Sequence, residues 1–109
     1  MFFIKNPSIS GMYGWTDPCV IQFTAKEVTG AVRFQFYSTS TPTTTYSYNY
    51  DFTNTGTHKL VYDGTNITAF LDGEQQGNPV AKQLNNTRLG FIVENNKSVK
   101  FTDFVIYPI

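Results

Sequence analysis

Two Asp-Gly steps, Asp63-Gly64 and Asp72-Gly73, constrain this chain more than any other feature. Glycine adopts the positive φ that tight turns need, and an aspartate side chain can accept hydrogen bonds from the backbone of its own turn. The residues before each step, 58–62 and 67–71, are rich in β-branched and aromatic side chains. The sequence therefore predicts a β-hairpin around residues 63–66, with a second turn that closes its second strand.

The rest of the chain repeats the period-two pattern of strands, and apolar residues at helical spacing extend over no more than about two turns. Val32, Phe34 and Phe36, for example, alternate with polar residues, as in a strand with one face in the core and one in water. Further strands are expected at residues 2–4, 20–24, 46–52, 88–93 and 99–107. About eight short strands with regular turn signals predict an all-β, antiparallel β-sandwich, with residues 1–109 forming a single domain.

Two local features lead to more specific expectations. Residues 74–86 are rich in Gln and Asn and include a glycine and a proline, so we expect a loop of about a dozen residues. In the last strand the apolar parity changes at Thr102-Asp103, which predicts a β-bulge.

Charge and cysteine content argue against several kinds of partner. Eight basic and eight acidic residues give a formal net charge of zero, and the basic residues are scattered singly, so we expect no nucleic-acid partner. No stretch approaches the roughly 20 apolar residues of a bilayer span, so no membrane insertion is expected. Cys19 is the only cysteine, which excludes an internal disulfide, and we expect it to be buried. The apolar start of the chain is too short for a signal peptide, so a surface location would be reached within a larger protein or particle.

The segment His58-Lys59-Leu60-Val61-Tyr62-Asp63-Gly64, together with Ile67-Thr68-Ala69-Phe70-Leu71-Asp72-Gly73, resembles the central hairpin of the concanavalin A-like lectin/glucanase superfamily, especially its laminin G-like domains. Residues 99–107 are similar to the last strand of that superfamily. The resemblance covers residues 58–107 and implies a lectin-like jelly roll. Compact versions occur in phage tail, fibre and baseplate proteins, where they recognise receptors or decorate particles, so it also implies an extracellular or virion-surface location.

Catalytic chemistry finds little support in the sequence. Glycosidases of this superfamily carry a Glu-x-Asp-x-x-Glu strand that places acid and nucleophile about 5.5 Å apart. Here Glu27, Glu74 and Glu94 lie in separate segments, and His58 is the only histidine. The parity of His58 with the apolar residues of its strand favours a place at the edge of the core. We therefore expect the protein not to be an enzyme.

The aspartates of the turns have two interpretations. Asp63 and Asp72 are typical turn-capping residues, and this structural role is favoured. A calcium site is the alternative, and it would need several oxygen ligands to converge. Asp63, Asp72 and Asp103 have no spacing that ensures such convergence, so no cofactor is expected.

Aromatic and amide side chains are the remaining candidates for function, since proteins hold neutral sugars by stacking a ring on the pyranose while polar groups bind its hydroxyls. Trp15 and Tyr13 lie in a Gly-rich segment beside Asp17, and these three residues are the first candidates for a ligand site. The alternative is that Trp15 plugs one end of the sandwich.

A second group of candidates follows in the chain. Tyr46, Tyr48 and Tyr50 share one strand face and could form a stacking platform, although core packing is the favoured interpretation for them. Tyr37 has the parity of polar residues on its strand and could extend such a platform.

The leading functional hypothesis is a non-catalytic carbohydrate-binding or adhesion module that recognises a host glycan or a cell-wall polysaccharide. The alternative is a structural or assembly module, such as a fibre, baseplate or capsid decoration domain, that forms a homo-oligomer or joins a larger particle without binding sugar.

Overall fold

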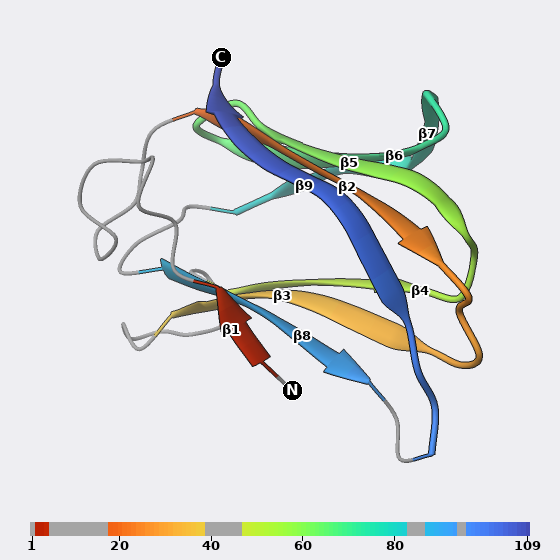
Figure 1. The fold of residues 1–109 in the computed structure, drawn as a ribbon. Coiled ribbons are helices and arrows are strands. Elements are labelled where there is room, and N and C mark those ends of the chain that lie inside the picture. The colour runs from red at the N-terminus through yellow and green to blue at the C-terminus, as the bar shows by residue number, and fades with distance from the viewer. Residues whose placement is uncertain (1, 5–17, 39–46, 83–86, 94–95) are drawn as a thin grey trace.

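The computed structural model describes residues 2–4, 18–38, 47–82, 87–93 and 96–109, and this part of the chain is all-β. Two antiparallel sheets lie one above the other (Figure 1). Their strands are β1 (Phe2–Ile4), β2 (Cys19–Lys26), β3 (Val32–Ser38), β4 (Tyr48–Phe52), β5 (Gly56–Tyr62), β6 (Asn66–Leu71), β7 (Glu74–Ala81), β8 (Thr87–Val93) and β9 (Lys100–Pro108). The predicted all-β fold with two antiparallel sheets is confirmed.

The two sheets differ in size and in the strands at their edges. One has four strands in the order β1-β8-β3-β4, and the other has five in the order β7-β6-β5-β2-β9. The hairpin predicted from the Asp-Gly steps is present as β5 and β6, with His58 opposite Leu71 and Tyr62 opposite Ile67. This hairpin lies in the middle of the five-stranded sheet and sets its register.

The core fills the space between the sheets, and Phe23 on β2 lies near its centre. The Phe23 ring meets Phe34 of β3 at 5.5 Å and Phe91 of β8 at 5.4 Å, both in the opposite sheet, measured between ring centroids. It also meets Phe101 of β9 at 5.5 Å, in its own sheet. Because aromatic rings bury large areas, this cluster ties the two sheets together.

The Asp63 side chain holds its Asp-Gly turn as the sequence predicts, whereas the Asp72 side chain binds the start of β5. The Asp63 Oδ1 atom accepts hydrogen bonds from the backbone N–H of Asn66 at 2.7 Å and of Thr65 at 2.9 Å. These bonds lower the pKa of Asp63 below its usual value, because they favour the charged carboxylate. Asp72 Oδ1 accepts a bond from the Thr57 N–H at 2.9 Å.

The expectation of a loop over residues 74–86 is wrong, because residues 74–81 form β7 and pair with β6. Asp72 and Gly73 have φ of 50° and 85°, as in a two-residue type I′ turn, so the chain reverses at once into this strand. All side chains of β7 are exposed, which removes the apolar alternation that marks other strands. Pro79 is tolerated because an edge strand leaves one side of its backbone unpaired.

The predicted bulge in the last strand is confirmed. Gln22 pairs with Val105, whereas Thr24 pairs with Thr102, so β9 places one extra residue opposite Phe23. Asp103 has a φ of 54° at this point. The bulge explains the change of parity, because it lets Phe104 contact Phe23 at 6.1 Å on the same side of the sheet as Phe101.

Candidate functional site

The first group of predicted site residues, Trp15, Tyr13 and Asp17, lies outside the described residues. Tyr46 of the second group lies outside them as well. Tyr37 belongs to β3, where its backbone pairs with Arg88, but its side chain also lies outside that part.

Tyr48 and Tyr50 face the core, so among these tyrosines the structure offers no exposed platform. Tyr50 is 9% exposed, and Tyr48 is half-buried with its ring 5.9 Å from that of Phe36. Burial raises the pKa of Tyr50 to about 12. The interpretation that these rings pack in the sandwich is the one that the structure supports for both residues.

The hydroxyl of Tyr50 lies 2.6 Å from Nδ1 of His58, whose side chain is fully buried. The other ring nitrogen, Nε2, lies 2.9 Å from the backbone oxygen of Asn54. A carbonyl oxygen can only accept, so Nε2 carries the proton and Nδ1 accepts from Tyr50. His58 is therefore a satisfied core histidine with no access to a substrate.

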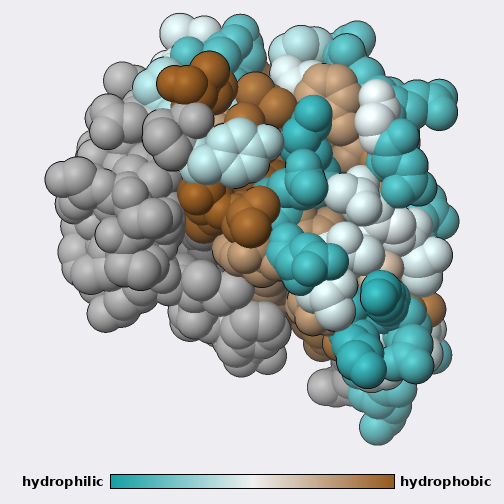
Figure 2. Space-filling model, turned by 45° about the horizontal axis from the view of Figure 1, so that its top comes forward, coloured by the Kyte–Doolittle hydropathy of each residue, from teal (hydrophilic) through white to brown (hydrophobic). Residues whose placement is uncertain are grey.

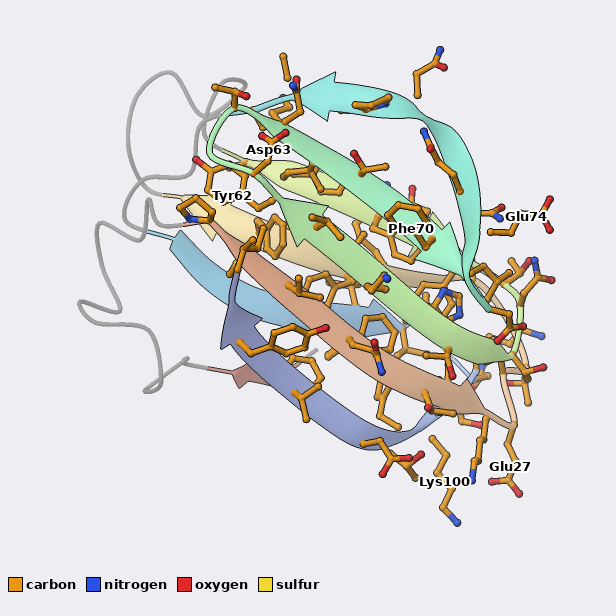
Figure 3. The ribbon with its side chains drawn as sticks, turned by 90° about the horizontal axis from the view of Figure 1, so that it is seen from above. Glu27, Tyr62, Asp63, Phe70, Glu74 and Lys100 are labelled. Carbon is orange, nitrogen blue, oxygen red and sulfur yellow. The ribbon has the colours of Figure 1, made fainter. Side chains whose placement is uncertain are left out.

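The acidic residues form no catalytic or metal-binding arrangement among the described residues. Glu27 follows β2 and Glu74 begins β7, and both point into solvent at separate places (Figure 3). Glu94 lies outside the described ranges. Asp63 holds its turn, Asp72 accepts a hydrogen bond from Thr57, and Asp103 lies at the bulge. The described chain has no group of three or more His, Cys, Asp or Glu that could hold a metal ion.

The outer face of the five-stranded sheet carries a polar and aromatic row that the sequence interpretation missed. Cross-strand pairing aligns Gln75 of β7, Phe70 of β6, Lys59 of β5 and Gln22 of β2. We call these four residues the Phe70 row. Figure 3 shows the Phe70 ring standing on the outer side of the sheet.

A cation–π contact organises the centre of this row. The Lys59 Nζ atom lies 4.9 Å from the centroid of the Phe70 ring. Such a contact holds the ammonium group beside the ring and keeps its three N–H donors near an apolar surface. With an amide from Gln75 on one side and from Gln22 on the other, the row joins one stacking surface to several hydrogen-bonding groups.

The alternation within the hairpin could have identified this row. His58, Leu60 and Tyr62 point into the core, so Lys59 must point outward, and Phe70 lies directly opposite Lys59. In the sequence, the pattern that indicates this row is an aromatic residue, Phe70, at an outward-facing position of the predicted hairpin.

An apolar strip lies at one end of the same outer face. Val105 and Tyr107 of β9 are each 44% exposed, and Ile109 is 71% exposed. Figure 2 shows hydrophobic residues gathered at this end of the sheet, whereas hydrophilic residues cover most of the rest. We call these three residues the β9 strip.

None of the described segments is a helix long and apolar enough to span a membrane. Comparison of the chain with protein-family models, with curated proteins and with solved structures finds no match.

Proposed function

We propose that this protein is a non-catalytic carbohydrate-binding module of the lectin-like jelly-roll type, which acts in adhesion at a virion or cell surface. The observation that carries the proposal is the Phe70 row, where one aromatic ring lies between two amides and an ammonium group. The resemblance of residues 58–107 to concanavalin A-like domains is consistent with it.

The chemistry of the row matches a neutral glycan. The apolar face of a pyranose stacks on an aromatic ring, and its hydroxyls both donate and accept hydrogen bonds. Gln22 offers a carbonyl oxygen and an NH₂ group, and Lys59 offers donors only. Gln75 offers its carbonyl oxygen and one further N–H, because its Nε2 already donates to the Gly77 oxygen at 3.0 Å. The row crosses four strands, and neighbouring strands lie roughly 4.8 Å apart, so it spans roughly 14 Å and can contact more than one sugar ring.

A single row of this kind binds weakly, and adhesion then depends on several copies acting together. A host glycan or a cell-wall polysaccharide presents its sugars repeatedly, which suits such binding. Glu27 and Glu74 lie in separate places and do not form the pair of carboxylates that a glycosidase uses, which supports a non-catalytic role.

Affinity electrophoresis in gels containing cell-wall polysaccharide tests the proposal. Phe70→Ala should abolish the retardation seen with the parent protein, while the matched control Val80→Ala, at an exposed position on β7, should leave it unchanged. Retardation that persists in Phe70→Ala and disappears in Trp15→Ala would move the site to the Gly-rich segment around residue 15. If neither Phe70→Ala nor Trp15→Ala changes the retardation, neither residue belongs to the binding site.

The β9 strip favours a second function, as an assembly module. Val105 and Tyr107 lie on an edge strand and Ile109 directly follows it, and exposed apolar patches often mark contacts with other protein subunits. Sedimentation of the parent and of Val105→Lys distinguishes the functions. An oligomer that dissociates in the variant, together with no retardation by polysaccharide, supports assembly in place of glycan binding.

A further inference from the structure

The opposite face of the molecule contains a separate cavity. It has a volume of about 300 Å³ and is lined by Ala31, Val32, Arg33, Asp51 and Ile92. Arg33 of β3 pairs with Asp51 of β4 on one side and with Ile92 of β8 on the other. Successive residues of a strand point to opposite faces, and the Val32 side chain points into the core. Its neighbour Arg33 therefore points outward, and the cavity beside Arg33 lies on the outer face of the four-stranded sheet.

An ion pair with fixed geometry forms one wall of this cavity. Arg33 Nε donates to Asp51 Oδ1 at 2.7 Å, and Arg33 Nη2 donates to Asp51 Oδ2 at 3.1 Å. This two-point contact fixes the planes of both groups. A guanidinium has five N–H donors, so three remain available, and each carboxylate oxygen can accept a further bond.

The pair is open to a ligand. The side chains of Arg33 and Asp51 are 45% and 58% exposed, and exposed pairs of this kind contribute little to folding. The next cross-strand pair on the same face of these two strands is Gln35 and Asn49, which adds two amides to the outer face. Aliphatic Ala31 and Ile92 complete the lining beside the charged wall.

We propose that this cavity binds a single neutral sugar ring that presents two adjacent hydroxyls to the Arg33–Asp51 pair. One hydroxyl donates to the carboxylate while its neighbour accepts from the guanidinium, and the C–H groups of the ring lie on Ala31 and Ile92. Asp51 already neutralises Arg33 and would repel a carboxylate or phosphate ligand bound beside it, whereas a neutral ligand meets no such repulsion.

The size of the cavity restricts the ligand further. Ligand pockets in proteins occupy roughly 300–1,000 Å³, so the volume of this cavity is at the lower limit. It has room for one sugar ring but not for an oligosaccharide. The site is on the other sheet from the Phe70 row and does not depend on it. The two sites together would make the module bivalent, with one ligand-binding surface on each outer face.

Nuclear magnetic resonance titration of the ¹⁵N-labelled protein with methyl α-mannopyranoside and methyl β-glucopyranoside tests this inference, with glucuronic acid as the charged comparison. At least one neutral glycoside should shift the amides of residues 31–33, 50–52 and 91–93, and glucuronic acid should shift them less. Arg33→Lys keeps the charge but removes the planar fork, and Asp51→Asn keeps the size but removes the charge. Each should raise the dissociation constant about tenfold or more, since a hydrogen bond to a charged group is lost.

Phe70→Ala is the matched control, because it alters the opposite sheet and should leave these shifts unchanged. The inference is overturned if neither neutral glycoside shifts the amides around the cavity, or if the shifts persist in both cavity variants. A failure of the Phe70 row in affinity electrophoresis leaves the cavity result unaffected, so the two failures can be told apart.

Discussion

At the scale of single residues, the contact between Tyr50 and His58 shows how this core holds polar groups. Both side chains are buried between the sheets, and Tyr50 belongs to the four-stranded sheet whereas His58 belongs to the five-stranded sheet. Their hydrogen bond of 2.6 Å therefore joins the two layers. The Nε2 bond to Asn54 leaves no nitrogen of the ring unsatisfied.

Tyr50→Phe tests the weight of this bond. The substitution keeps the ring but leaves Nδ1 of a buried histidine without a donor, which should lower the free energy of unfolding by about 1–3 kcal/mol. Urea denaturation followed by circular dichroism measures the change. Tyr107→Phe removes a hydroxyl from a ring that is 44% exposed and should change stability by no more than about 0.5 kcal/mol. Equal effects of the two substitutions would contradict the role of the Tyr50 hydroxyl.

The same histidine should make stability depend on pH. Burial lowers the pKa of His58 from its usual value of 6.5, and the Asn54 bond and the Asp72 charge oppose this only in part. Below about pH 6.5 the unfolded chain therefore binds a proton that the folded protein does not, so stability falls as pH decreases, by at most about 1.4 kcal/mol per pH unit.

Urea denaturation between pH 5 and 8 measures this dependence, with His58→Gln as the control that should remove it from the window. The lowered pKa of Asp63 acts at a lower pH, because the carboxylate loses its stabilising effect only below its usual value of 3.8. A flat profile for the parent protein between about pH 5 and 6.5 would show that His58 binds its proton in the folded state as readily as in the unfolded chain.

The alternation of residues along each strand predicted only some of the side chains that face the core. It indicated correctly that Phe34 and Phe36 lie in the core, but it placed His58 at the edge of the core, whereas that side chain is fully buried. It could not show whether the face shared by Tyr48 and Tyr50 points inward, because tyrosine is stable on either side when its hydroxyl finds a partner. That partner, His58, is in the other sheet, and no sequence pattern links the two.

At the scale of secondary-structure elements, the two edges of the five-stranded sheet show what the sequence could and could not predict. The bulge in β9 was predictable because apolar residues occur on both sides of it and the parity visibly changes. Strand β7 was not predicted because both of its faces are exposed, so its pairing with β6 depends on backbone bonds and on the Asp72-Gly73 turn. Gln75 joins the Phe70 row only through that pairing, whereas Lys59 and Phe70 belong to the hairpin that the sequence predicts.

Two glycines near this turn should respond differently to alanine. At Gly56, φ is 132° and an added Cβ would lie 2.7 Å from Asp72 Oδ2 and 3.0 Å from Leu71 Cδ1. At Gly73, φ is 85° and nothing lies within 4 Å of the added atom. Gly73→Ala should therefore cost about 1 kcal/mol from backbone strain alone, and Gly56→Ala about 2–3 kcal/mol because the Asp72 carboxylate must also move.

Thermal unfolding of the two variants gives the comparison, with Gly73→Asn as a third variant. Asparagine adopts positive φ more readily than alanine, so Gly73→Asn should lose less stability than Gly73→Ala. If Gly56→Ala proves the milder of the two alanine substitutions, the contact between Asp72 and the start of β5 is not what restricts residue 56 to glycine.

At the scale of the whole molecule, one aromatic core supports two outer faces with different chemistry. The Phe23 cluster joins the sheets, so the Phe70 row on one side and the Arg33–Asp51 cavity on the other are held by the same packing. Substitutions of Phe70, Lys59, Arg33 or Asp51 should leave the core intact, since none of these four side chains belongs to it. This separation makes it possible to test the two sites independently.

The only cysteine can report whether this molecule opens as one unit. Cys19 is fully buried in the five-stranded sheet, where it pairs with Tyr62 of β5 and with Pro108 of β9. A buried thiol reacts only when the structure around it opens, so a thiol reagent should label Cys19 at the same urea midpoint at which the circular dichroism signal is lost. Because β9 is an edge strand held only by β2 among the described strands, labelling at lower urea concentrations would instead show that β9 detaches first. In that case the β9 strip and the bulge would belong to a unit that opens separately, whereas strands β2, β5, β6 and β7, which carry the Phe70 row, would still unfold with the core.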